Sequence, residues 1–267
     1  MIWRALGVLG FMMLAGCSDS PERGAHPSTP GVLYEFVWSD RSEVMNDDGT
    51  WTTESDAGYT VDVSSGLLTI STVQLIPCDD AQVPDGSAWL LRAFDWLFAV
   101  RSARAGHGVA ESDPSAVLAE QIERLSSEAA TVMGPAELGA VDYCGLHVLF
   151  GPSLVARPTD EVEMDQHVLH LEGSWRRGEG SPVSFTVHTE LPTAALVDLE
   201  GPDGAALRIP KGSRAAVVQV ERELRSLFDG IDFETMSDDA RDKAILLAVV
   251  DELQARVVAM ETDSPGP

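Results

Sequence analysis

The chain has 267 residues, with 43 acidic and 18 basic side chains and a formal net charge of −25 at pH 7. The negative electrostatic field of this charge disfavours nucleic acid and anionic lipid surfaces as partners and favours cations. The alternative explanation for the charge is the solubility of an exposed protein. About 235 residues follow the N-terminal segments described next, which fits one large all-β or α+β domain.

The N-terminus is typical of a bacterial lipoprotein signal peptide. Arg4 precedes an apolar run at residues 5–15, and a small residue lies directly before Cys17. The run is shorter than the roughly 20 residues that span a bilayer as a helix. Leu14–Cys17 resembles the bacterial lipobox, which implies cleavage before Cys17 and acylation of its thiol and new amino group. Two or three acyl chains are enough for stable anchoring. The alternative is an ordinary secreted protein with a chance cysteine.

Residues 17–30 are polar and rich in proline and serine, which predicts a flexible tether between the lipid and the folded domain. By resemblance to sorting rules in enteric bacteria, Ser18 after the lipidated cysteine favours the outer membrane. The predicted location is therefore the bacterial cell envelope, with the membrane as a partner through the N-terminal lipid.

Cys78 and Cys144 are the cysteines that are left once Cys17 is lipidated. An even pair of thiols in an oxidising compartment predicts a disulfide. The alternative, a pair of soft metal ligands, lacks CxxC spacing and a nearby histidine cluster in the sequence.

Residues 31–260 are predicted to form one domain that consists mainly of antiparallel β-strands. Alternating apolar residues place strands at Val32–Trp38, Tyr59–Val63, Leu67–Ile76, Val141–Phe150, Val168–Trp175, Pro182–Glu190, Ala194–Leu199, Ala206–Ile209 and Ala215–Val220. Asn46–Gly49 is a turn signal between strands. In the strand at 141–150, Cys144 shares the core face with Leu146, Val148 and Phe150.

A few peripheral helices are also predicted. Pro114–Ser127 has apolar residues at helical spacing, and Glu221–Phe228 is predicted to be helical. Ser237 is a predicted cap for a C-terminal amphipathic helix whose apolar stripe runs from Ile245 to Val257. The most apolar stretch, Ala88–Val100, is either core or an interfacial membrane helix. Residues 261–267 are predicted to be a disordered tail.

Two histidines form the candidate site. Pairing Leu171 with Val187 in the predicted hairpin puts His170 directly opposite His188 on the outer face. Cross-strand Cβ atoms lie about 4.5 to 5.5 Å apart, so two imidazoles can share one metal ion. Additional ligands are expected among Glu172, Glu190, His147 and His167. Imidazole with carboxylate suits copper(II), zinc or nickel. The alternative is a pair of solvated histidines.

Three segments resemble the MbnP-like periplasmic β-sandwich proteins and lipoproteins of similar layout from myxobacteria and their relatives. These segments are Gly58–Val63 followed by Leu67–Leu75, the strand around Tyr143-Cys144, and Val218–Phe233. The resemblance implies a β-sandwich. It also implies that copper is bound in some members by histidines and, in some, by an oxidised tryptophan. The segment that carries this tryptophan is not found, so no family ligand is assigned to this chain.

The sequence contains no GxSxG, HExxH or SxxK motif and no P-loop. The predicted function is therefore that of a non-catalytic binding or interaction module for a metal ion, a small ligand or another envelope protein. A periplasmic copper-binding protein is the first alternative, and a hydrolytic enzyme is the second.

Overall fold

The computed structural model describes residues 31–46, 48–78, 113–153, 164 and 166–262. The predicted signal peptide, Cys17, the tether and the apolar stretch Ala88–Val100 lie outside the described residues. Among the residues that are described, no helix is both long and apolar enough to cross a membrane.

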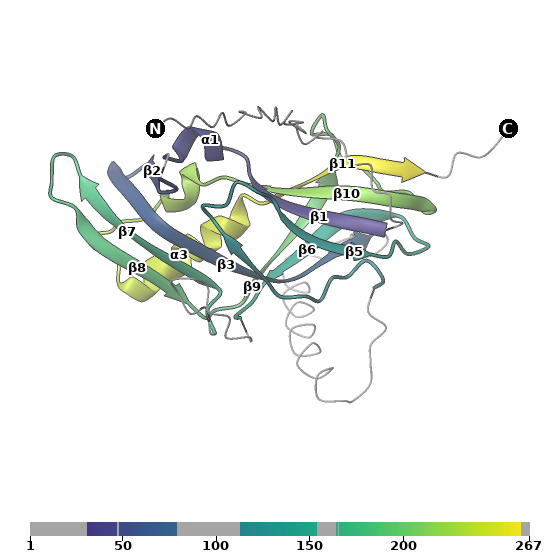
Figure 1. Ribbon diagram of the computed structural model, residues 1–267, viewed down its shortest axis with the longest axis horizontal. Coiled ribbons are helices and arrows are strands. Elements are labelled where there is room, and N and C mark those ends of the chain that lie inside the picture. The colour runs from purple at the N-terminus through teal and green to yellow at the C-terminus, as the bar shows by residue number, and fades with distance from the viewer. Residues whose placement is uncertain (1–30, 47, 79–112, 154–163, 165, 263–267) are drawn as a thin grey trace, which may run out of the picture.

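The described part of the chain is mainly β (Figure 1). Its strands are β1 (Gly31–Trp38), β2 (Trp51–Glu54), β3 (Tyr59–Pro77), β4 (Gln121–Arg124), β5 (Thr131–Ala136), β6 (Tyr143–Phe150), β7 (Leu169–Arg177), β8 (Val183–Thr189), β9 (Thr193–Glu200), β10 (Ser213–Arg222) and β11 (Gln254–Thr262). Its helices are α1 (Arg41–Val44), the 3-10 helix η1 (Arg225–Phe228) and α3 (Asp238–Asp251).

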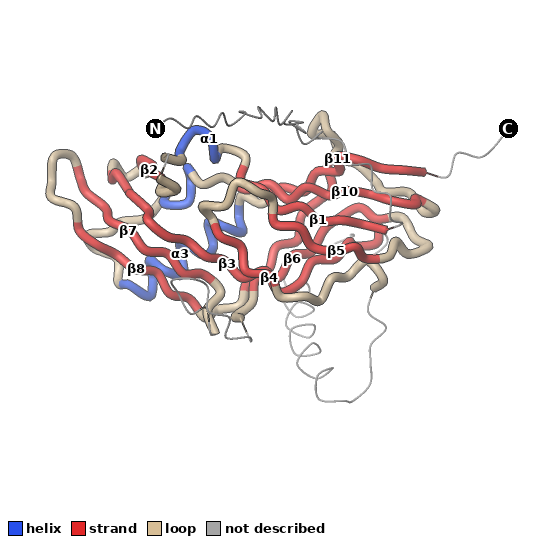
Figure 2. Tube along the Cα trace, viewed as in Figure 1, coloured by secondary structure: helices blue, strands red, loops and turns tan. Residues whose placement is uncertain are grey.

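These strands form one sheet in the order β5-β1-β10-β11-β9-β6-β3-β7-β8, with β2 and β4 also paired to β3. Figure 2 shows the sheet curling, with β7 and β8 at one end and β5 and β1 at the other. The mainly β class is confirmed. The uniformly antiparallel arrangement is wrong, because β1 pairs with β10 and β9 with β11 in parallel. Two facing sheets of a sandwich are not confirmed.

The strand β3 joins two segments that the sequence predicts as separate strands. It is 19 residues long, and it changes partners along its length. Its first half pairs with β2 and β7, and its second half pairs with β4 and β6. A register shift lies between Val63 and Ser65. At Gly66 a Cβ atom would lie 2.8 Å from Leu125 Cδ1, so a larger residue at this position on β3 would displace the buried Leu125 side chain.

The predicted helix at residues 114–127 is wrong. Val117 forms a bridge to Val73 of β3, Ile122 pairs with Thr69, and the Leu125 amide donates to the Gly66 carbonyl. Leu118, a member of the expected apolar face, is 57% exposed. The hydrogen bonds that this segment exchanges with β3 outweigh its helical spacing, so it is extended.

The helix α3 begins where it was predicted, but it is not C-terminal. Ser237 Oγ accepts a hydrogen bond from the Ala240 amide, and Ile245, Leu246 and Val249 are buried. Val257, predicted on the same helical stripe, lies instead in β11 opposite Val218. The helix ends at Asp251, because the residues that follow form β11 and pair with the edge of β10.

Three further boundaries differ from the prediction. Residues 261 and 262, expected in a disordered tail, are in β11 because they pair with Ala215 and Ser213 of β10. The predicted strand Ala206–Ile209 forms isolated bridges at its two ends. In the predicted helix at 221–228, the first two residues complete β10 and the last four form η1.

Candidate functional site

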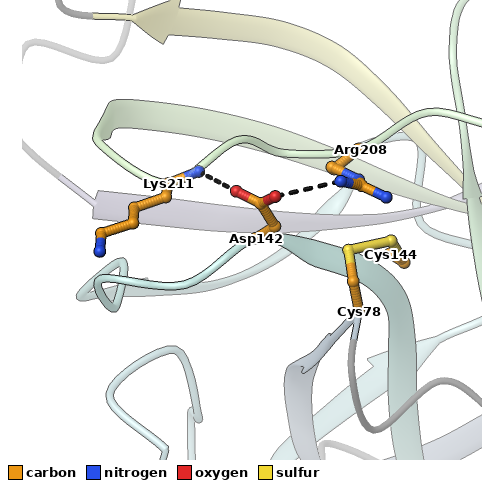
Figure 3. The surroundings of a disulfide bond; sticks show 5 residues. All are labelled: Cys78, Asp142, Cys144, Arg208 and Lys211. Carbon is orange, nitrogen blue, oxygen red and sulfur yellow. Dashed lines mark hydrogen bonds and ion pairs between the residues drawn. A yellow bond between two sulfur atoms is a disulfide. The ribbon is translucent and has the colours of Figure 1, made fainter.

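The predicted disulfide is present in the structure (Figure 3). Cys78 follows the end of β3, and Cys144 lies in β6, with their Cα atoms 4.8 Å apart. Asp142 holds the surrounding backbone in place. Its carbonyl accepts from the Cys78 amide at 2.9 Å, and its carboxylate accepts from the Lys211 amide at 2.6 Å and from Arg208 Nη1 at 3.1 Å.

The prediction that Cys144 lies on the core face is wrong in part, because this residue is half-buried whereas its neighbours Tyr143 and Gly145 are buried. A register shift between Ile76 and Pro77 of β3 interrupts the alternation at this end of β6. The disulfide is therefore at the margin of the core.

The hairpin of β7 and β8 has the register that was predicted from the sequence. Leu171 pairs with Val187, and His170 pairs with His188. The two imidazoles turn toward each other, with Nδ1 of His170 3.2 Å from Nδ1 of His188 and ring centroids 4.6 Å apart. At this separation one ring donates a proton to the other, or both ring nitrogens share an ion.

The expectation of two solvent-facing histidines is wrong for His170. His170 is 2% exposed, whereas His188 on the edge strand is exposed. The His188 ring packs against His170, and the His167 ring lies 5.0 Å from the His188 ring. Leu169 and Leu171 are also buried, so β7 begins inside the domain with both of its faces covered. The site is thus a cluster of three histidine rings, in which His170 is buried, His167 is half-buried and His188 is exposed.

Burial and the neighbouring ring of His188 disfavour protonation of His170. Desolvation, followed by repulsion from His188, lowers the pKa of His170. The carboxylate of Glu172 opposes this shift, with Oε1 3.4 Å from Nε2 of His170. Glu172 therefore faces the ring nitrogen that points away from His188. It does not lie between the two rings, as a shared metal ligand would.

Helix α3 fixes the outer strand of this site. The Asp242 carboxylate accepts from the His188 amide at 3.1 Å, and Arg241 Nη2 donates to the Thr186 carbonyl at 3.0 Å. Arg241 is itself paired with Asp238 and Asp242. Neither Arg241 nor Asp242 was predicted, because they lie more than 50 residues from the hairpin on a helix with no motif.

The other predicted ligands are not brought to the pair. His147 lies in β6 opposite Gln74 and Leu196, and β3 lies between β6 and β7 in the sheet. Glu190 is exposed beyond the end of β8. In the part of the chain that the structure describes, no three His, Cys, Asp or Glu side chains are arranged to hold one metal ion together.

His147 gives the domain a pH dependence of its own. Burial lowers its pKa from 6.5 to about 4. Because the unfolded chain binds this proton near pH 6.5 and the folded chain does not until about pH 4, stability is full above pH 6.5 and is lost as the pH falls through this window. Between about pH 6.5 and about pH 4, we expect protonation linked to His147 to lower the free energy of unfolding by about 3 kcal/mol.

Urea unfolding of the wild type and of His147→Gln at about pH 7 and about pH 4.5 measures this loss. The variant should show a clearly smaller decrease between the two pH values. His26→Gln, which changes a histidine of the predicted tether, is the matched control. Equal decreases in His147→Gln and in the wild type would contradict the prediction.

Comparison with known proteins does not assign the chain to a family. No family model, no curated protein and no solved structure matches it.

Proposed function

We propose that the chain is a lipid-anchored protein of the bacterial outer membrane whose β domain serves as a non-catalytic binding module. The observation that carries this proposal is the Cys78–Cys144 disulfide, since such bonds form and persist in oxidising compartments such as the periplasm. It agrees with the signal peptide and lipobox pattern that ends at Cys17. The proposal includes a distant relationship to the MbnP-like β-sandwich proteins, whose strand patterns the chain shares in sequence.

The histidine cluster supports a binding role. His170 and His188 direct their Nδ1 atoms at each other, at 3.2 Å. General-base catalysis requires a ring nitrogen aimed at the proton that it removes. Two nitrogens aimed at each other are better suited to sharing a proton or an ion. The site also lies on two paired strands fixed by α3, which gives a binding site a rigid frame.

Membrane attachment is tested by Cys17→Ser. This change removes the thiol that receives the diacylglycerol. We therefore expect the protein to lose lipid labelling and to be no longer converted to the cleaved, lipid-anchored form. Fractionation of cells fed labelled palmitate measures both effects. A second variant, Ser18→Asp, should stay lipidated and shift toward the inner membrane.

Undiminished palmitate labelling of Cys17→Ser would contradict the anchor. Membrane association without labelling, after the signal peptide is shown to be removed, would identify a second attachment. The apolar stretch Ala88–Val100 is then the segment to delete.

A further inference from the structure

The geometry points to a metal site in which His170 and His188 bind one divalent ion of the copper(II) or zinc(II) class through their Nδ1 atoms. This inference rests on the proposed binding function and names its ligand. It differs from the site expected from sequence, because Glu172 is assigned to orient a histidine and not to bind the ion.

The separation of the two nitrogens fits a shared ion. Nδ1 of His170 lies 3.2 Å from Nδ1 of His188. Nitrogen–zinc distances are about 2.0 to 2.1 Å, so two ligand nitrogens at this separation subtend an angle of about 100° at the ion, near the tetrahedral value. An ion can therefore replace the shared proton without moving either strand.

The surroundings of His170 select the ring tautomer that such an ion needs. A histidine that binds metal through one nitrogen commonly donates the other N–H to a carboxylate, which fixes the ring and makes it more basic. Nε2 of His170 is buried and makes no hydrogen bond, and Glu172 Oε1 is 3.4 Å from it. A proton on Nε2 directed at Glu172 leaves the Nδ1 lone pair free to face His188.

The frame around His188 holds the second ligand in place without a competing charge. Asp242 accepts the His188 amide hydrogen, which fixes the backbone from which this ring projects. The guanidinium of Arg241 is neutralised by Asp238 and Asp242. The chain as a whole carries a formal charge of −25, so its field attracts cations toward such a site.

The ligand set decides which ions fit. Two imidazoles suit copper(II) and zinc(II), whereas magnesium and calcium prefer oxygen ligands. Two protein ligands leave coordination positions for water or for an exchangeable partner molecule. The His167 ring, 5.0 Å from the His188 ring, borders this open side. The site is thus suited to an ion that is taken up and passed on.

The test uses the mature lipidated protein in detergent, stripped with a chelator and then titrated with copper(II), zinc(II) or magnesium in competition with a chromophoric chelator. We expect one copper(II) or zinc(II) ion per chain and no magnesium binding. His188→Ala, a change at an exposed side chain, should weaken binding at least about 10-fold, as should His170→Ala. Glu172→Gln should weaken binding less than either, and His26→Ala should leave it unchanged.

Copper(II) electron paramagnetic resonance supplies a signature that a purely structural role would not change. Hyperfine splitting from two imidazole nitrogens in the wild type, reduced to one in His188→Ala, supports the site. Equal affinity in the wild type and His188→Ala, or copper bound without nitrogen splitting, overturns it. Membrane fractionation of the same wild-type preparation separates the two proposals: anchored protein that binds no metal overturns the metal site and leaves the lipid-anchored module standing.

Discussion

Changing Glu123 to leucine is expected to lower the free energy of unfolding by about 3–5 kcal/mol, because it leaves the Arg222 guanidinium buried without its counter-charge. Nη2 of Arg222 lies 2.7 Å from Oε1 of Glu123, and the two side chains are 1% and 4% exposed. The guanidinium also lies over the Trp38 ring at 4.3 Å and the Phe36 ring at 5.4 Å. Neither aromatic ring supplies the negative charge that the Glu123 carboxylate provides.

The double variant Glu123→Leu/Arg222→Met tests whether the loss in Glu123→Leu comes from leaving Arg222 as an unpaired buried charge. Removing both charges avoids the desolvation cost, so the double variant should be more stable than Glu123→Leu alone. Urea unfolding of the single and double variants measures the difference. The matched control is Glu234→Leu, which breaks the exposed pair with Arg177 and should cost less than about 1 kcal/mol.

Two outcomes would contradict this account of the core. The first is a loss in Glu123→Leu no larger than in the Glu234→Leu control. The second is a double variant less stable than the single one, which would mean that packing of the two side chains outweighs their charges.

The hairpin that carries the histidine pair could be predicted from the sequence because both of its strands alternate strictly. Leu169 and Leu171 on one strand and Phe185 and Val187 on the other must face the same core, and a one-residue slip would expose all four. This constraint fixed His170 opposite His188. It did not show that His170 is buried, because that depends on rings and segments packed over the hairpin.

Elements that depend on distant partners were predicted less well. The segment at 114–127 has helical spacing, and it became extended because it pairs with β3, some 50 residues earlier in the chain. Val257 was predicted on the apolar stripe of the helix, yet it lies in β11, which fills the edge of β10. The parallel pairing of β1 with β10 joins segments about 180 residues apart, and alternation alone does not identify a partner at that distance.

The same reasoning explains which parts of the candidate site were missed. Arg241 and Asp242 contact the backbone of β8 from a helix, and a polar pair near the start of a helix is usually a surface feature. Their role becomes visible when β8 is seen to be an edge strand, since the Thr186 carbonyl and the His188 amide point outward and need partners. No pattern within α3 encodes that need.

The second large effect is expected at the disulfide. Replacing Cys78 and Cys144 together by alanine should lower the free energy of unfolding by about 4 kcal/mol. The bond joins residues that are 66 positions apart, and the chain-entropy model assigns about this much to a loop of that length. The disulfide acts mainly by lowering the conformational entropy of the unfolded chain, so the folded structure of the variant should be unchanged.

Denaturant unfolding of the double variant and of the wild type, with and without reductant, measures this contribution. Reduced wild type should match the double variant, and reductant should not affect the variant. Thiol titration of the denatured, unreduced wild type should detect no free thiol, since Cys17 is proposed to be acylated and the other two cysteines are paired. Two reactive thiols per chain would show that the bond is not formed in the cell. They would also remove the observation on which the envelope location rests, because the disulfide is the structural feature that ties this domain to an oxidising compartment.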